Sequence, residues 1–60
     1  MSKEKMYNVI VRKLGHEHKA TIWFIEFAET VPDEKNDQLY NVLIALLDLV
    51  EYAEEIFEGV

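Results

Sequence analysis

Two pairs of acidic residues have a spacing that suits metal-dependent chemistry. Glu26 and Glu29 are three residues apart, and Asp48 and Glu51 repeat this spacing after eighteen intervening residues. Side chains three residues apart share a helical face, and carboxylates on facing helices can hold magnesium for phosphate chemistry. If the four acids converged, the chain would be a carboxylate-metal-dependent nucleotide hydrolase assembled as an oligomer, which is our alternative prediction. Solvated acids at helical spacing are the simpler interpretation.

The two pairs loosely resemble the acidic residues of the all-helical nucleotide pyrophosphatases of the MazG type. The second pair stands in reversed order, and 60 residues are fewer than such an enzyme needs. Because the resemblance covers these four acids and no other feature, we transfer no catalytic role and no cofactor from that family.

A compact polar group, His16, Glu17 and His18, follows Gly15. Imidazole and carboxylate groups both bind metals, but the chain has only these two histidines and no cysteine. A structural metal would therefore lack its remaining strong ligands. We expect an exposed turn or a helix start here, with no metal site.

Groups suited to covalent catalysis are scarce. Without cysteine, the aliphatic hydroxyl nucleophiles are Ser2, Thr21 and Thr30, and their positions suggest no catalytic triad. A glycine-rich phosphate loop is excluded because Gly15 and Gly59 are the only glycines. The sequence predicts a protein that is not an enzyme and has no cofactor.

The element that would position most of these acids is a helix near residues 34 to 58. Pro32 suits its first turn, and Gly59 can follow its end. Apolar residues recur along it at steps of three and four, which predicts one core-facing side made of Leu39, Val42, Leu43, Leu46, Leu49, Val50, Ala53, Ile56 and Phe57.

Two shorter helices are predicted near residues 2 to 14 and 18 to 30. In the first, Met6, Ile10 and Leu14 repeat every four residues, Ser2 can cap the start and Gly15 follows the end. The second matches an amphipathic template, which predicts core positions for Ala20, Trp23, Phe24, Phe27, Ala28 and Val31.

An α+β fold is the alternative. Residues 8–13 and 21–27 are rich in β-branched and aromatic residues and could form a β-hairpin followed by one long helix. The second strand would be apolar on both faces, whereas one helix covers only one face of a two-stranded sheet. We therefore predict an all-α fold, a single small three-helix domain spanning residues 1–60.

The size of the chain limits its stability. A domain of 60 residues buries only about 60% of the surface of its unfolded chain, and without cysteine no disulfide strengthens it. Oligomerisation is the remaining aid, so we expect a homo-oligomer, most simply a dimer. No apolar run approaches the roughly 18 residues of a membrane span, and we expect a cytoplasmic protein without a membrane partner.

A second apolar stripe, Tyr40, Ile44 and Leu47, lies on the last predicted helix away from its core-facing side. If this helix is sandwiched between the other two, the stripe is simply more core. Otherwise it is an exposed patch of the kind that marks interfaces. We predict a homodimer packed through the stripe, joined by Ile22 and Ile25.

Charge is divided unequally along the chain. The first twenty residues carry five bases and two acids, while the last forty carry ten acids and one lysine, for a net charge of -6. The acids of the last helix gather beside the stripe: Asp37, Asp48, Glu51, Glu54, Glu55 and Glu58. A solvated surface is the simpler interpretation of this side, and a docking face for a basic protein is the functional one.

The predicted function is that of a small acidic interaction protein, a regulator, inhibitor or accessory factor of a size common among bacterial and phage products. A small nucleic-acid-binding regulator is a further alternative, although the net charge makes direct contact with phosphate unfavourable. The predicted partner-binding residues are Tyr40, Ile44, Leu47, Asp48, Glu51, Glu55 and Glu58.

Overall fold

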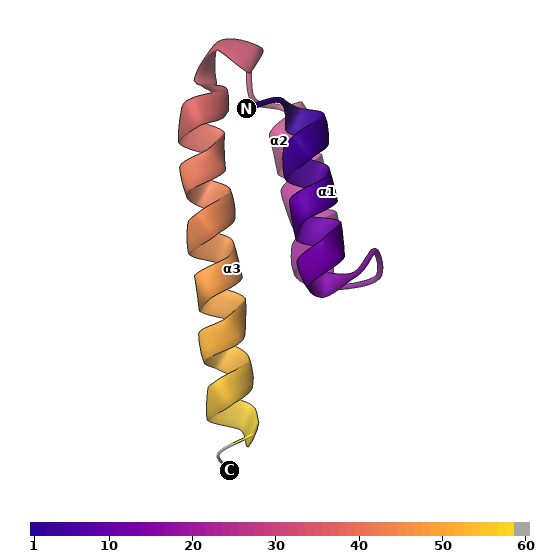
Figure 1. Ribbon diagram of the computed structural model, residues 1–60, viewed down its shortest axis with the longest axis vertical. Helices are drawn as coiled ribbons and strands as arrows, with labels where there is room; N and C mark the ends of the chain where they lie inside the picture. The colour runs from indigo at the N-terminus through magenta and orange to yellow at the C-terminus, as the bar shows by residue number, and fades with distance from the viewer. Residues whose placement is uncertain (59–60) are drawn as a thin grey trace.

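The computed structural model describes residues 1–58, which form three α-helices joined by two short connections (Figure 1). The prediction of an all-α fold is confirmed, and the β-hairpin alternative is wrong, since residues 8–13 and 21–27 are helical. The predicted role of Gly59 after the last helix lies outside the described residues. The elements in chain order are α1 (Lys3–Leu14), α2 (Lys19–Glu29), a 3₁₀ turn η1 (Asp33–Lys35) and α3 (Asn36–Glu58).

Side-chain and glycine caps fix the ends of α1. The Ser2 hydroxyl oxygen accepts a hydrogen bond from the Lys5 N–H at 3.3 Å. At the other end, Gly15 donates its N–H to the Val11 carbonyl at 2.7 Å and has a φ of +91°, a conformation that favours glycine. Both predicted cap roles are confirmed, and together they limit α1 to three turns.

Lys3 ties the start of α1 to the connection between α2 and α3. Its ammonium group donates to the Val31 carbonyl oxygen and to the Asp33 carboxylate, each at 2.6 Å. The Lys3 side chain is largely buried whereas Asp33 is exposed, so the bond to the carbonyl stabilises the fold more than the ion pair does. This contact holds the N-terminus beside the turn that begins α3.

The core lies where α1, α2 and the first half of α3 meet. The ring of Tyr7 packs edge-on against Phe24, with centroids 6.5 Å apart. Each helix contributes two apolar side chains that are at most 2% exposed, namely Met6, Ile10, Phe24, Ala28, Leu39 and Leu43. Because every helix faces both of the others, only a narrow strip of each is fully enclosed.

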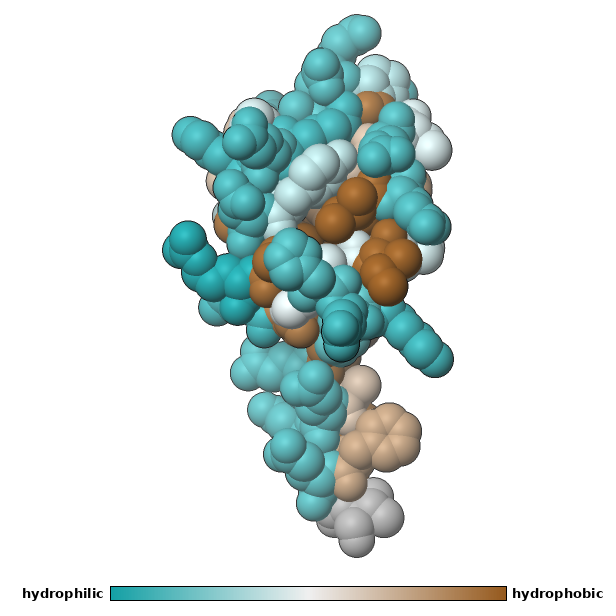
Figure 2. Space-filling model, turned by 90° about the vertical axis from the view of Figure 1, so that its right-hand side faces the viewer, coloured by the Kyte–Doolittle hydropathy of each residue, from teal (hydrophilic) through white to brown (hydrophobic). Residues whose placement is uncertain are grey.

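The core does not extend along all of α3. Leu49, Ala53, Ile56 and Phe57, predicted to face the core, are exposed, as is every residue from 51 to 58. The reason is length, since α1 has 12 residues and α2 has 11 whereas α3 has 23. The far end of α3 therefore projects beyond its neighbours, and Figure 2 shows hydrophobic side chains along one edge of it and hydrophilic ones along the other.

The core prediction is also wrong for two aromatic residues of α2. Trp23 and Phe27 are 50% and 37% exposed, and their rings stack on each other with centroids 5.1 Å apart. The buried side chains of α2 are Thr21, Phe24 and Ala28, so the enclosed strip is rotated away from Trp23. The amphipathic pattern identified the helix, while the position of its neighbours decides which edge of the apolar side is covered.

Replacing Ile10 with alanine tests the position of the core. Ile10 is fully buried between the helices, and we expect the free energy of unfolding to fall by about 2–5 kcal/mol, the usual cost of such a cavity. The matched control is Ile22→Ala on α2, where the side chain is 47% exposed, with an expected change within about 0.5 kcal/mol. Urea unfolding measures both, and equal losses would contradict this core.

Replacing Thr21 with valine should stabilise the protein. Thr21 is fully buried, and its hydroxyl oxygen has no hydrogen-bond partner, so valine removes an unsatisfied polar group at similar volume. We expect a gain of about 1 kcal/mol in thermal or urea unfolding. Thr30→Val is the control, because the exposed Thr30 hydroxyl donates to the Phe27 carbonyl at 2.7 Å and should bring no gain. A loss of stability in Thr21→Val would contradict the description of the Thr21 hydroxyl as a buried group without a hydrogen-bond partner.

Candidate functional site

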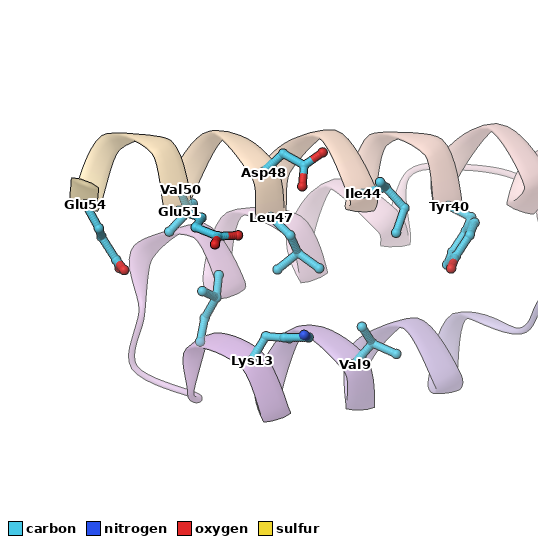
Figure 3. A pocket seen from close by; sticks show the side chains of 10 residues that line it. Val9, Lys13, Tyr40, Ile44, Leu47, Asp48, Val50, Glu51 and Glu54 are labelled. Carbon is cyan, nitrogen blue, oxygen red and sulfur yellow. The ribbon is translucent and has the colours of Figure 1, made fainter. Parts of the chain in front are cut away.

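A pocket of about 550 Å³ opens between α1 and α3, at the level where α1 ends. We call it the α1–α3 groove. It is lined by Val9, Lys13 and Leu14 from α1 and by Tyr40, Ile44, Leu47, Asp48, Val50, Glu51 and Glu54 from α3 (Figure 3).

The floor of the groove is apolar. Tyr40, Ile44 and Leu47 point from α3 toward α1, where Val9 lies on the opposite wall (Figure 3). Tyr40 and Leu47 are half-buried, and Ile44 remains 40% exposed. Tyr40, Ile44 and Leu47 lie at steps of four and three on α3, beside the residues of α3 that are buried in the core. The helix α1 therefore covers them in part. The stripe is neither enclosed core nor a fully exposed patch.

The far part of the groove is acidic. Asp48, Glu51 and Glu54 are all exposed and line the groove, to which α1 contributes Lys13 as the single base of the lining. Among residues 1–58, Lys13 forms no ion pair with these acids, since the two contacts of that kind join Lys3 to Asp33 and His18 to Glu54. The carboxylates at this end therefore retain a net negative charge.

The predicted partner-binding residues come together in part. Tyr40, Ile44, Leu47, Asp48 and Glu51 line the groove, which is five of the seven. The other two, Glu55 and Glu58, are exposed on the projecting end of α3. The dimer predicted through the stripe stays a prediction.

The contribution of α1 to the groove was missed. Val9 and Lys13 are four residues apart and lie beside the buried pair Met6 and Ile10 rather than on it. Their spacing shows that they share an edge of α1. It does not show that α3 lies against that edge, so no signal in the sequence identified them.

The two acidic pairs remain on separate exposed surfaces. Glu26 and Glu29 belong to α2, and Asp48 and Glu51 belong to α3. Within the part of the chain that the structure describes, no three histidine, aspartate or glutamate side chains are grouped as a metal site would require.

His18, from the polar group after α1, has a structural role. Its Nδ1 accepts a hydrogen bond from the Ala20 N–H at 3.0 Å and caps the start of α2. Its Nε2 lies 3.9 Å from a carboxylate oxygen of Glu54 on α3. His16 and Glu17 are exposed in the turn. The predicted helix start is therefore confirmed, and the cap links this turn to the acidic end of the groove.

No family model matches the chain, and comparisons with curated proteins and with solved structures give no match. Among the described residues, no helix has the length and apolar character needed to cross a membrane.

Substitutions of His18 separate its two contacts. His18→Ala removes both the cap and the approach to Glu54, and we expect the free energy of unfolding to fall by about 0.5–2 kcal/mol. His18→Asn keeps a favoured capping side chain, so it should match or exceed the parent protein in urea unfolding. A loss in His18→Asn as large as in His18→Ala would mean that the contact with Glu54 dominates.

Proposed function

We propose that this protein is a small, non-enzymatic regulator, inhibitor or accessory factor that binds a basic segment of another protein in the α1–α3 groove. The observation that carries the proposal is the combination of an apolar floor with exposed carboxylates, of which Asp48 and Glu51 form no ion pair within residues 1–58. A cytoplasmic setting suits such a role.

The charge of α3 favours a basic ligand. Over its 23 residues α3 has no lysine or arginine, and its acids continue past the groove through Glu55 to Glu58. Complementary fields speed the encounter of charged partners and select among them. Nucleic acid is a poor ligand for the same surface, because phosphates would be repelled by these carboxylates.

The apolar floor adds a second requirement. Tyr40, Ile44 and Leu47 lie at steps of four and three, which suits apolar side chains that are repeated on one face of a partner helix. From Tyr40 to Glu58 the helix runs about 27 Å, room for about five turns of such a partner. The ligand that fits best is an amphipathic helical segment with apolar residues on one side and lysine or arginine beside them.

A synthetic amphipathic peptide of leucine and lysine is a suitable probe of the groove. Replacing Asp48 with asparagine and Glu51 with glutamine removes two exposed charges with little change of shape. We expect peptide affinity to fall about three- to tenfold, as two exposed ion pairs would contribute. Isothermal titration calorimetry measures this, and affinity for the parent protein should weaken at higher ionic strength.

The matched control changes net charge equally at a distant place. Glu26→Gln with Glu29→Gln removes two exposed acids from α2, outside the groove, and should leave peptide affinity within about twofold of the parent. Equal weakening by both double variants would mean that overall charge, not the groove, attracts the peptide. Affinity that does not respond to salt would also reject the proposal.

A further inference from the structure

The side of α3 away from the groove carries a regular apolar seam. We define the α3 seam as Leu39, Val42, Leu46, Leu49, Ala53 and Ile56, whose steps of three and four alternate without a break. This is the spacing of the a and d positions of a heptad, which pack against another helix. Leu39 is buried by its own subunit and Val42 and Leu46 are half-buried, but Leu49 is 65% and Ile56 52% exposed. Half of the seam therefore has no helix against it.

We propose that two copies of this chain pair through the α3 seam, with the two α3 helices antiparallel. This proposal is independent of the groove, which lies on the other side of α3.

The distribution of charge favours a second copy as the occupant. At about 100° per residue, the acids of the projecting end lie roughly 110° or more around the helix from the centre of the seam. The residues that flank the seam, Ala45, Val50, Tyr52 and Phe57, carry no charge. Two acidic chains can therefore meet along this side without placing carboxylates against each other. A basic partner would find no acid there to bind.

The exposed aromatic surface supplies more than half of the area that a stable dimer requires. Four aromatic side chains, Trp23, Phe27, Tyr52 and Phe57, are between 37% and 80% exposed. They offer on the order of 450 Å² per subunit at about 200 Å² for each full side chain. A standard stable interface takes about 800 Å² from each partner. Leu49 and Ile56 add to this area from the seam itself.

The antiparallel arrangement follows from the register of the seam. In one antiparallel register, every heptad position a of one copy lies opposite a heptad position d of the other. Leu46 then faces Leu49 of the second copy and Val42 faces its Ala53, while Ile56 of the second copy lies at the level of Leu39, which its own subunit already buries. The α3 of the second copy thereby packs against the projecting end, which the short helices α1 and α2 of the same subunit do not reach.

The second copy also offers a receiving groove. A pocket between α2 and α3 is lined by residues that include Phe27, Val31, Lys35, Leu39 and Val42. The antiparallel register brings Ile56 of the other chain to this pocket. Lys35 is the one base among the last forty residues, and it would meet the acidic end of that chain.

Helix dipoles favour the same orientation. The last turn of α3 has no base and contains acids, which is unfavourable beside the negative end of its own helix. Antiparallel pairing places these acids near the N-terminal end of the other α3, where the positive end of the helix dipole and Lys35 act against the repulsion from Asp33, Glu34 and Asp37. Parallel pairing would instead bring both acidic ends together.

Sedimentation velocity at about 50 μM tests the pairing, a concentration at which weak dimers are populated. The parent protein should sediment as a dimer. Leu49→Gln with Ile56→Gln should raise the dimer dissociation constant at least about a hundredfold by removing apolar contacts from both copies. Ile44→Gln, an equally polar change on the groove side, should leave it within about threefold.

A monomeric parent protein would overturn the proposal, as would dimers that survive Leu49→Gln with Ile56→Gln. Dimers lost instead in Ile44→Gln would assign the interface to the stripe of Tyr40, Ile44 and Leu47. The seam variant should still bind the leucine–lysine peptide, so failure of the dimer and failure of the groove are distinguishable.

Disulfide trapping tests the orientation, and the natural chain contributes no background because it has no cysteine. Chains with Val42→Cys are mixed with chains with Ala53→Cys and oxidised. Antiparallel pairing places Cys-substituted position 42 beside position 53 of the other copy, whereas identical positions are about 16 Å apart along the axis and cannot join. We expect mixed dimers by mass spectrometry, and a product dominated by identical pairs would refute the antiparallel arrangement.

Discussion

The three helices are unequal in length, and the arrangement of the protein depends on this inequality. At about 1.5 Å per residue, α1 and α2 extend roughly 18 Å and α3 roughly 34 Å. The two short helices can enclose only the part of α3 around Leu39 and Leu43, where the core forms. Beyond Val50, α3 is exposed on all sides in the single subunit. A helix of so few turns is marginal in water without tertiary contacts, so the projecting end has reason to find a partner.

Because the charged residues of α3 lie on one side of the helix, its two sides suit different partners. On the groove side, apolar residues are followed by Asp48, Glu51 and Glu54, and this combination suits a ligand that is both apolar and basic. On the seam side, Leu49 and Ile56 are flanked by uncharged residues, which suits a copy of the same acidic chain. One helix can thus serve two associations because carboxylates occupy only one of its sides. A dimer of this kind would display two grooves facing outward.

Local spacing was enough to predict much of the fold. The 3–4 repeat of apolar residues indicated three helices, and Ser2 and Gly15 marked the ends of α1, because caps depend on neighbouring residues alone. Spacing also placed Tyr40, Ile44 and Leu47 beside Asp48 and Glu51 on the last helix, and all five line the groove.

Local spacing does not show which other helix packs against a given side of a helix, or how far along that side it extends. Trp23 and Ile56 lie on apolar sides of their helices, yet both are exposed because no other helix of the subunit covers those positions. Val9 and Lys13 line the groove for the opposite reason, because α3 lies against the edge of α1 that carries them. These outcomes depend on helix length and relative position, which arise only when the three helices pack together.

Amide hydrogen exchange along α3, followed as a function of protein concentration, tests most directly whether the projecting end of α3 is stabilised only by a second copy. In dilute solution, the amides of Leu39–Leu46 should be protected by the core, while those of Leu49–Phe57 should exchange rapidly. Protection of Leu49–Phe57 should then rise as the protein is concentrated. Strong protection of Leu49–Phe57 that is equal to that of Leu39–Leu46 and independent of concentration would contradict the account.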